Sequence, residues 1–328
     1  MKLSEAKQKF TVYLQTQHKA DSTVEAYVNV ITAFGSWLIK NPETTKLTPS
    51  KRVETYLTYR VQEDDISAST QNVDLNALIA FHRMSGIEIQ GVNALRARKR
   101  ERIPPILSRE QVHALINGFP EEYKLIPLLL YGCGMRINEV LRLRLKDIDF
   151  PNKKIVIHEA KGDKDRDVNI PEKIMPELKA QYFFAVETWQ HDKRHRFNGV
   201  HCGGVEKKYP AYPTSKEWYW LFPAPELSTD PKTKTPMMRH HLKDWFIQPL
   251  FVRVRELLDL PIYTSAHKLR HACFTHMAAD MIKQGFPEKM IRAQLKDVAG
   301  HVNDETINFY IHLAAPKSAV IRSPLEIP

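Results

Sequence analysis

Apolar and polar residues alternate with the period of a helix over the first 86 positions. In "DSTVEAYVNVITAFGSWL" one helical face collects the apolar residues Val24, Tyr27, Val28, Ile31 and Phe34. Ser22 and Glu25 have the spacing of a capping box at the start of this helix. Thr48 before Pro49 predicts another helix start, and "STQNVDLNALIAFHRM" predicts a fourth helix that stops at Gly86. Four such helices predict a small bundle over residues 1–95.

A basic stretch follows the predicted bundle. It contains Arg96, Arg98, Lys99, Arg100 and Arg102. Pro104 and Pro105 come next and disfavour helix, so residues 96–106 are predicted to form an extended linker. A solvated hinge is one interpretation. We favour a segment that lies along a phosphate backbone, where each cation replaces a counterion.

The pattern from residue 107 onward predicts a second domain that is mainly helical with a small sheet. Ser108 and Gln111 predict a capped helix, and "IPLLLYGCGMRINEVLRLRLKDIDF" continues with helical spacing. Residues 155–170 change to period two, which predicts two strands joined by a Gly-Asp turn. Helical spacing resumes from Met238 to about residue 315. The predicted fold class is therefore α+β, with domains at 1–95 and 107–328.

Residues 189–235 interrupt this second domain. They combine Trp, Tyr, Lys, Gly and Pro with little periodicity. Long loops inside compact domains are usually functional or disordered, and the aromatic content argues against disorder. A purely structural brace remains open beside a binding role.

Composition narrows the class of protein. The 328 residues carry a formal net charge of +10, which favours a polyanionic partner. There is no run of 18 apolar residues, and "MKLSEAKQKF" lacks the apolar region of a signal peptide, so we expect no membrane span. Three cysteines without a CxxC pattern suggest a reducing cytosol.

Six separated polar residues point to phosphate chemistry. They are Arg136, Lys161, His267, Arg270, His301 and Tyr310. Two arginines can clamp the non-bridging oxygens of one phosphate, and a tyrosine hydroxyl can attack it. Lysine can protonate the leaving oxygen, and the histidines can donate hydrogen bonds or relay protons. No acidic cluster for a metal is apparent, so we expect no cofactor.

Each of these residues also has an ordinary structural interpretation. Tyr310 could be a core aromatic, and Arg136 could be the buried partner of nearby Glu139. Lys161 could be a turn lysine with Lys164 as its competitor, and His267 could cap a helix or lie in the core. We interpret His271, in "HKLRH", as structural. A metal pair of His267 and His271 is disfavoured because no HExxH glutamate accompanies them.

Four motifs together resemble the tyrosine recombinase (phage integrase) family. They are "GCGMRINEVLRL", "AKGDKDRDV", "HKLRH" and "AGHVNDETINFYIH". The resemblance implies a C-shaped two-domain clamp on DNA, with a helical core-binding domain and a catalytic domain. It also implies that the six residues above form the active site, with Tyr310 as the nucleophile of a 3′-phosphotyrosyl intermediate. A homotetramer on DNA, in the bacterial cytoplasm at the nucleoid, follows from the same resemblance.

A finer resemblance rests on the insert. "EKKYPAYPTSKEWYWLFPA", the following "MMRHH" and the late "SPL" are similar to integron integrases. This implies binding of folded single-stranded attC hairpins as well as duplex sites, because aromatic faces stack on unpaired bases. The candidate DNA contacts are Arg98, Lys99, Arg100, Tyr209, Trp218, Tyr219, Trp220, Arg239, His240 and His241.

Three rival functions stay open from the sequence. A chromosomal or phage-type recombinase would act only on duplex sites. A catalytically inactive copy would bind DNA as a regulator. A metal-dependent nuclease is the most distant alternative.

Overall fold

The computed structural model describes residues 3–91, 105–158, 165–231, 233–300 and 304–314. The chain divides into two compact units, Met1–Ile103 and Pro104–Pro328. The division falls within the stretch expected to be a linker. Arg98, Lys99 and Arg100 of that stretch lie outside the described residues.

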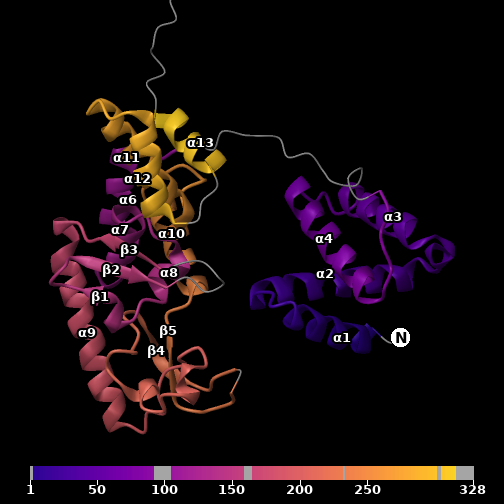
Figure 1. Ribbon diagram of the computed structural model, residues 1–328, viewed down its shortest axis with the longest axis horizontal. Coiled ribbons are helices and arrows are strands. Elements are labelled where there is room, and N and C mark those ends of the chain that lie inside the picture. The colour runs from indigo at the N-terminus through magenta and orange to yellow at the C-terminus, as the bar shows by residue number, and fades with distance from the viewer. Residues whose placement is uncertain (1–2, 92–104, 159–164, 232, 301–303, 315–328) are drawn as a thin grey trace, which may run out of the picture. The chain divides into compact units, whose positions relative to one another are not determined.

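The first unit is a helical bundle, as its apolar spacing predicted (Figure 1). Its helices are α1 (Leu3–Thr16), α2 (Asp21–Lys40), α3 (Pro49–Gln62) and α4 (Ala68–Met84), with the short 3-10 helix η1 (Pro42–Lys46). Their apolar faces meet in one core that includes Phe10, Ile31, Phe34, Tyr56 and Leu75.

The start of α3 confirms one helix-cap prediction, and the start of α2 contradicts another. The Thr48 side chain accepts a hydrogen bond from the Lys51 backbone N–H at 3.3 Å. The predicted capping box of Ser22 and Glu25 is wrong, because α2 begins at Asp21 with Ala20 as its N-cap. Ser22 therefore lies inside the first turn, and Asp21 places an acidic residue in the same turn, where the helix dipole favours negative charge.

The second unit is mainly helical. Its helices are α6 (Arg109–Gly118), α7 (Leu125–Gly132), α8 (Ile137–Leu141), α9 (Met175–Arg194), α10 (Asp244–Leu257), α11 (Ala266–Lys283), α12 (Glu288–Ala299) and α13 (Asp304–Ala314), with 3-10 turns η2 (Glu121–Tyr123), η3 (Leu145–Asp147), η4 (Glu172–Ile174), η5 (Val205–Lys207) and η6 (Tyr212–Thr214). The predicted capping box of Ser108 and Gln111 opens α6. Among the described residues, no helix is both long enough and apolar enough to cross a bilayer.

A break between α7 and α8 interrupts the segment that was predicted to be helical. Gly134 adopts φ +60°, and a Cβ there would lie 2.8 Å from Cζ of Phe274 on α11. A side chain at this position would therefore meet both backbone strain and a packed ring. The break places Arg136 at the N-cap of α8, beside α11.

The two predicted strands are present and pair with each other, and the Gly-Asp turn expected between them lies outside the described residues. Strands β1 (Ile148–Asp149), β2 (Lys154–Ile157) and β3 (Arg166–Asn169) form an antiparallel sheet in this order. Ile155 pairs with Val168, and Ile157 pairs with Arg166. Ile155, Ile157 and Val168 are buried, so the alternating positions face the core. The register also directs Arg166 towards α8.

The insert is more regular than the sequence suggested. Helix α9 runs through Arg194, so residues 189–194 are helical, and strand β4 (Pro223–Ser228) lies within the predicted insert. Residues from Met238 were expected to be helical, but Met238–His241 form strand β5, which pairs antiparallel with β4. In Figure 1, α9 passes the three-stranded sheet and extends towards β4 and β5.

Candidate active site

Three elements of the second unit bring the catalytic candidates together. Arg136 comes from the N-cap of α8, Arg270 from the N-terminal part of α11 and Tyr310 from α13. Helix α11 packs against both α7 and α13. In Figure 1, α11, α12 and α13 gather at one end of this unit.

Arg270 is fixed by backbone carbonyls. Its side chain is 5% exposed, and it donates to the carbonyls of Gly134 and Ala299, the latter at 2.7 Å. Burial, assisted by the nearby Arg136 cation, lowers the pKa of Arg270 to about 10. A buried guanidinium with this little compensating charge is stabilised when an anion binds beside it.

Glu139 organises the arginines. Its carboxylate accepts from the Arg136 backbone N–H at 2.8 Å, from Arg136 Nη1 at 2.7 Å and from Arg166 Nη2 at 2.7 Å. Nη1 of Arg270 lies 3.9 Å from the same carboxylate. Burial raises the pKa of Glu139, but the hydrogen bonds from Arg166 and Arg136 outweigh it, so the pKa is lowered. Three guanidinium groups around one carboxylate leave the cluster with a net positive charge.

The two interpretations of Arg136 therefore apply together. The ion pair with Glu139 holds the side chain, which remains 40% exposed and can still reach a ligand. Sequence reasoning missed Arg166, whose side chain is 8% exposed and extends from β3 to Glu139. Its position in "AKGDKDRDV", two residues before a buried strand position, was the only signal for it.

Tyr310 combines a buried ring with a polar environment for its hydroxyl. The residue is 3% exposed, and its ring lies 5.3 Å from that of Phe274, centroid to centroid. Its Oη lies 2.9 Å from Nδ1 of His271. Burial raises the pKa of Tyr310, while Arg270 and Arg136 lower it, so the phenol lies within electrostatic reach of both guanidinium groups. The core-aromatic interpretation describes the ring only.

Two histidines on α11 border the same cluster. The rings of His267 and His271 are 4.4 Å apart and nearly perpendicular. Burial, then the charges of Arg270, Lys268 and Arg136, lower the pKa of His267. No pattern in the sequence indicated that His271 contacts Tyr310.

The remaining catalytic candidates, Lys161 and His301, lie outside the described residues. The described parts of the chain contain no group of three or more His, Cys, Asp or Glu side chains placed to hold a metal ion. The site consists instead of guanidinium, imidazole and phenol groups.

The aromatic residues of the insert stack on one another. Tyr209 and Tyr212 lie 4.7 Å apart at 15°, and Tyr212 and Trp218 lie 5.0 Å apart at 25°. The Arg144 guanidinium continues the stack, 4.9 Å from the Trp218 ring and 3.8 Å from the Trp220 ring. We call these five side chains the aromatic stack. Arg144 also donates to the carbonyls of Trp218 and His201, which fixes the stack to the domain.

Three of the predicted DNA contacts are buried. Tyr219 is 0% exposed, Trp220 is 7% exposed and Arg239 is 5% exposed. The Tyr219 hydroxyl donates to Asp192 at 2.5 Å, and Trp220 Nε1 donates to the Arg239 carbonyl at 3.0 Å. These side chains have no surface for a base, so we interpret them as a brace. Tyr209 is 41% exposed, and Trp218, His240 and His241 are half-buried.

A buried ion pair holds this brace together, and its loss should destabilise the second unit. Asp192 accepts from Nε of Arg239 at 2.9 Å and from Nη2 at 2.5 Å. Asp192→Ala would leave the Arg239 guanidinium and the Tyr219 hydroxyl buried without this partner. We expect a loss of about 3–5 kcal/mol in the free energy of unfolding. Urea denaturation followed by tryptophan fluorescence measures it.

The control for Asp192→Ala is Glu172→Ala. Glu172 pairs with Lys153 on the surface, where both side chains are more than half exposed. We expect this variant to lose less than about 1 kcal/mol. Equal destabilisation by the two variants would contradict the role of the buried pair.

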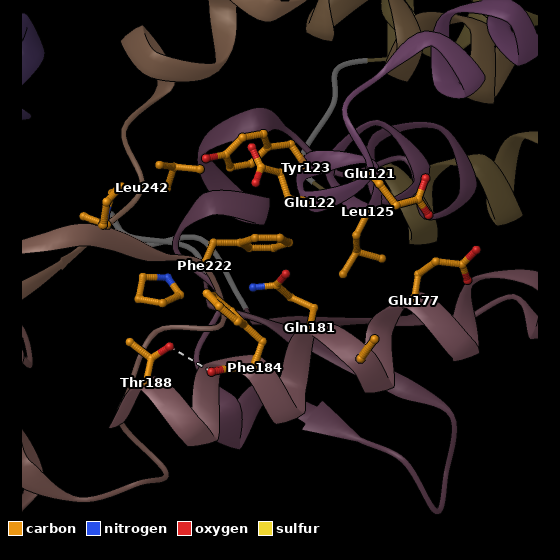
Figure 2. A pocket seen from close by; sticks show the side chains of 14 residues that line it. Glu121, Glu122, Tyr123, Leu125, Glu177, Gln181, Phe184, Thr188, Phe222 and Leu242 are labelled. Carbon is orange, nitrogen blue, oxygen red and sulfur yellow. Dashed lines mark hydrogen bonds between the residues drawn. The ribbon is translucent and has the colours of Figure 1, made fainter. Parts of the chain in front are cut away.

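A separate apolar pocket lies beside α9. It has a volume of about 500 Å³, and Figure 2 shows Phe222, Phe184, Leu242 and Leu125 around it, with carboxylates such as Glu177 near its edge. Its lining contains none of the residues of the candidate active site around Arg136, Arg270 and Tyr310. The carboxylates at its edge would repel the DNA backbone, so we assign this pocket no part in the chemistry.

Comparisons with known proteins agree with this fold. The phage integrase family matches residues 105–316, and the N-terminal SAM-like domain of phage integrases matches residues 7–85. An integrase/recombinase of Escherichia coli is 32% identical over 313 residues, which cover 94% of this chain and 89% of that protein. The tyrosine recombinase XerA of Pyrococcus furiosus is 26% identical over 179 residues, which cover 54% of this chain and 60% of that protein.

Solved structures share the fold at low identity. The Tn1549 transposon integrase, in complex with transposon right end DNA, has a TM-score of 0.58 at 16% identity, with 93% of this chain and 94% of that one covered. The lambda integrase bound to DNA has a TM-score of 0.57 at 15% identity, with 97% and 98% covered. The family match over residues 105–316 identifies the second unit as a tyrosine recombinase catalytic domain. The chain belongs to the phage integrase family and is a site-specific recombinase that acts on DNA.

Proposed function

We propose that this recombinase cleaves and rejoins DNA through a 3′-phosphotyrosyl bond to Tyr310. One observation carries the assignment. The Tyr310 hydroxyl bonds to His271, the residue next to Arg270, and its pKa responds to both Arg270 and Arg136. A phosphate held by these two guanidinium groups would therefore lie close to the phenol oxygen.

Each step of the proposed reaction uses side chains of this chain. Arg136 and Arg270 hold the non-bridging oxygens and stabilise the charge that develops on them. The Tyr310 oxygen attacks phosphorus, and the bond to the 5′-oxygen breaks. Lys161 protonates the departing 5′-oxygen, while His267 assists proton transfer and His301 stabilises the transition state. A 5′-hydroxyl of another strand then attacks the phosphotyrosine and releases Tyr310.

The proposed chemistry uses no cofactor. The phosphotyrosyl bond conserves the energy of the phosphodiester that was broken, so the second step reverses the first. The three arginines around Glu139 provide positive charge at the position where the transition state becomes negative. We further propose a homotetramer on two DNA sites, acting at the nucleoid in the bacterial cytoplasm.

The proposed substrates are integron attI and attC sites, including attC hairpins folded from a single strand. Support comes from Tyr209, which is 41% exposed at the outer end of the aromatic stack. An unpaired base that stacked on Tyr209 would continue a column already fixed by Arg144. His240 and His241 on β5, together with Arg98, Lys99 and Arg100, are the other proposed contacts.

Tyr209→Ala tests this substrate. Stacking of one base contributes about 1–3 kcal/mol, so we expect affinity for a folded hairpin to fall about 5- to 150-fold. Affinity for a duplex of the same sequence should change less than twofold, since no base is unpaired there. Fluorescence anisotropy with the two labelled DNAs measures both.

Tyr209→Phe is the matched control, because it keeps the ring and should bind as the unchanged protein does. Deletion of residues 191–225 is a poor test, since it removes Asp192, Tyr219 and Trp220 from the core. Equal loss on duplex and hairpin, or no loss on either, would favour the rival recombinase that acts only on duplex sites.

A further inference from the structure

We propose that His271 is the general base that accepts the proton of the Tyr310 hydroxyl during strand cleavage. This inference rests on the proposed function, in which Tyr310 is the nucleophile. The sequence motifs placed proton transfer on His267 and left His271 as a structural residue. The geometry points instead to the second histidine of "HKLRH".

The contact between the two side chains suits proton transfer. Oη of Tyr310 and Nδ1 of His271 are 2.9 Å apart, within the range of about 2.6–3.2 Å expected for a general base. The two ring centroids are 5.5 Å apart. The ring centroid of His267 lies 4.4 Å from that of His271, so the His271 imidazole is held between His267 and Tyr310.

Protonation states agree with the direction of transfer. Burial, with the charges of His267, Lys268 and Arg270 on the same helix, lowers the pKa of His271 to about 4. The imidazole is therefore neutral at pH 7, and Nδ1 can accept from the hydroxyl. Burial also raises the pKa of Tyr310, so the phenol is protonated and requires an acceptor before it attacks.

Binding of DNA strengthens the base. Tyr310 from α13 contacts the His271 ring, and Arg136 acts on both His267 and Tyr310. Among the described residues, the groups whose charges lower the pKa of His271 are His267, Lys268 and Arg270 from α11. Their charges disfavour an imidazolium in the free protein. A phosphate between Arg136 and Arg270 adds negative charge, which favours the imidazolium and raises the basicity of His271 as the substrate arrives.

The proton balance closes over both steps. In cleavage the Tyr310 O–H bond breaks, its proton moves to Nδ1 of His271, and the phenol oxygen forms the bond to phosphorus. The 5′-oxygen leaves and takes a proton from Lys161. In rejoining the attacking 5′-hydroxyl gives its proton back to Lys161. The His271 imidazolium protonates the departing Tyr310 oxygen, which restores the starting state.

The test is single-turnover cleavage of a nicked suicide substrate by His271→Ala. General bases contribute about 10²- to 10⁴-fold, so we expect the rate to fall at least 100-fold. The cavity left by the ring should admit imidazole, which should restore part of the rate in proportion to its neutral form across the pH range. His271→Gln keeps a hydrogen-bond acceptor but no base, and it should be as slow as His271→Ala.

His276→Ala is the matched control. Nδ1 of His276, on the same helix, lies 2.9 Å from the hydroxyl of Tyr131, so the variant removes an equivalent histidine–tyrosine pair away from the arginine cluster. We expect this variant to cleave at the rate of the unchanged protein, and added imidazole should not change that rate.

The outcomes separate the two proposals. If the unchanged protein forms no covalent adduct, the proposed function fails before His271 is tested. If it forms the adduct and either His271 variant retains the full rate, the general-base assignment is wrong. A slow His271→Ala whose rate imidazole does not raise at any pH also overturns it, because that pattern indicates a structural residue.

Discussion

Tyr310→Phe should abolish the covalent adduct with DNA and leave folding and DNA binding intact. The phenol oxygen is the proposed nucleophile, and phenylalanine has no atom that can replace it. The ring contact with Phe274 persists, so only the hydrogen bond to His271 is lost, at a cost of about 1 kcal/mol of stability. Denaturing electrophoresis of protein incubated with a suicide substrate measures the adduct.

Tyr131→Phe is the control for this loss. Its hydroxyl also bonds to a histidine of α11, and its removal should leave adduct formation unchanged. An adduct of normal yield in Tyr310→Phe would mean that another side chain attacks the phosphate.

Arg270→Lys should slow cleavage about 10³-fold, with DNA affinity changed little. Lysine keeps the charge but lacks the planar fork that reaches a phosphate and the carbonyls of Gly134 and Ala299 together. Loss of one arginine that stabilises a phosphoryl transition state is expected to cost about 10³- to 10⁵-fold. Single-turnover rates on the suicide substrate measure the effect.

A methylphosphonate at the scissile position sharpens this test. It replaces a charged non-bridging oxygen with a methyl group, so less positive charge is required and the deficit of Arg270→Lys should shrink. Arg109→Lys is the control, because Arg109 pairs with Asp280 on the surface of the same unit. A deficit of the same size on both substrates would contradict contact between Arg270 and that oxygen.

Local patterns in the sequence predicted the elements but not their meeting points. The Thr48 and Ser108 caps and the pairing of β2 with β3 depend on residues close in the chain, so local side-chain chemistry determines them. In contrast, Phe274 of α11 packs closely against Gly134 at the break, and the Tyr310 hydroxyl contacts His271, which is 39 positions away in the chain. Such contacts form only when distant helices pack.

The insert shows the same limit for aromatic residues. In "EWYWLF" the residues from Trp218 to Trp220 look alike as surfaces for a base. The buried Tyr219 donates a hydrogen bond to Asp192 at the end of α9, and the Arg144 guanidinium covers the Trp220 ring. Neither partner is adjacent in sequence, so periodicity alone could not separate the brace from the exposed Tyr209.

The central claim is that Tyr310 attacks the phosphate held by the arginines. Locating the covalent bond between protein and DNA tests this claim most directly. Trypsin should release the segment from Asp297 to Lys317, in which Tyr310 is the sole tyrosine. Mass spectrometry of the trapped and nuclease-trimmed adduct should find a nucleotide joined through its 3′-phosphate to Tyr310 of this peptide. A nucleotide on any other residue, or a 5′-phosphate linkage, would contradict the account.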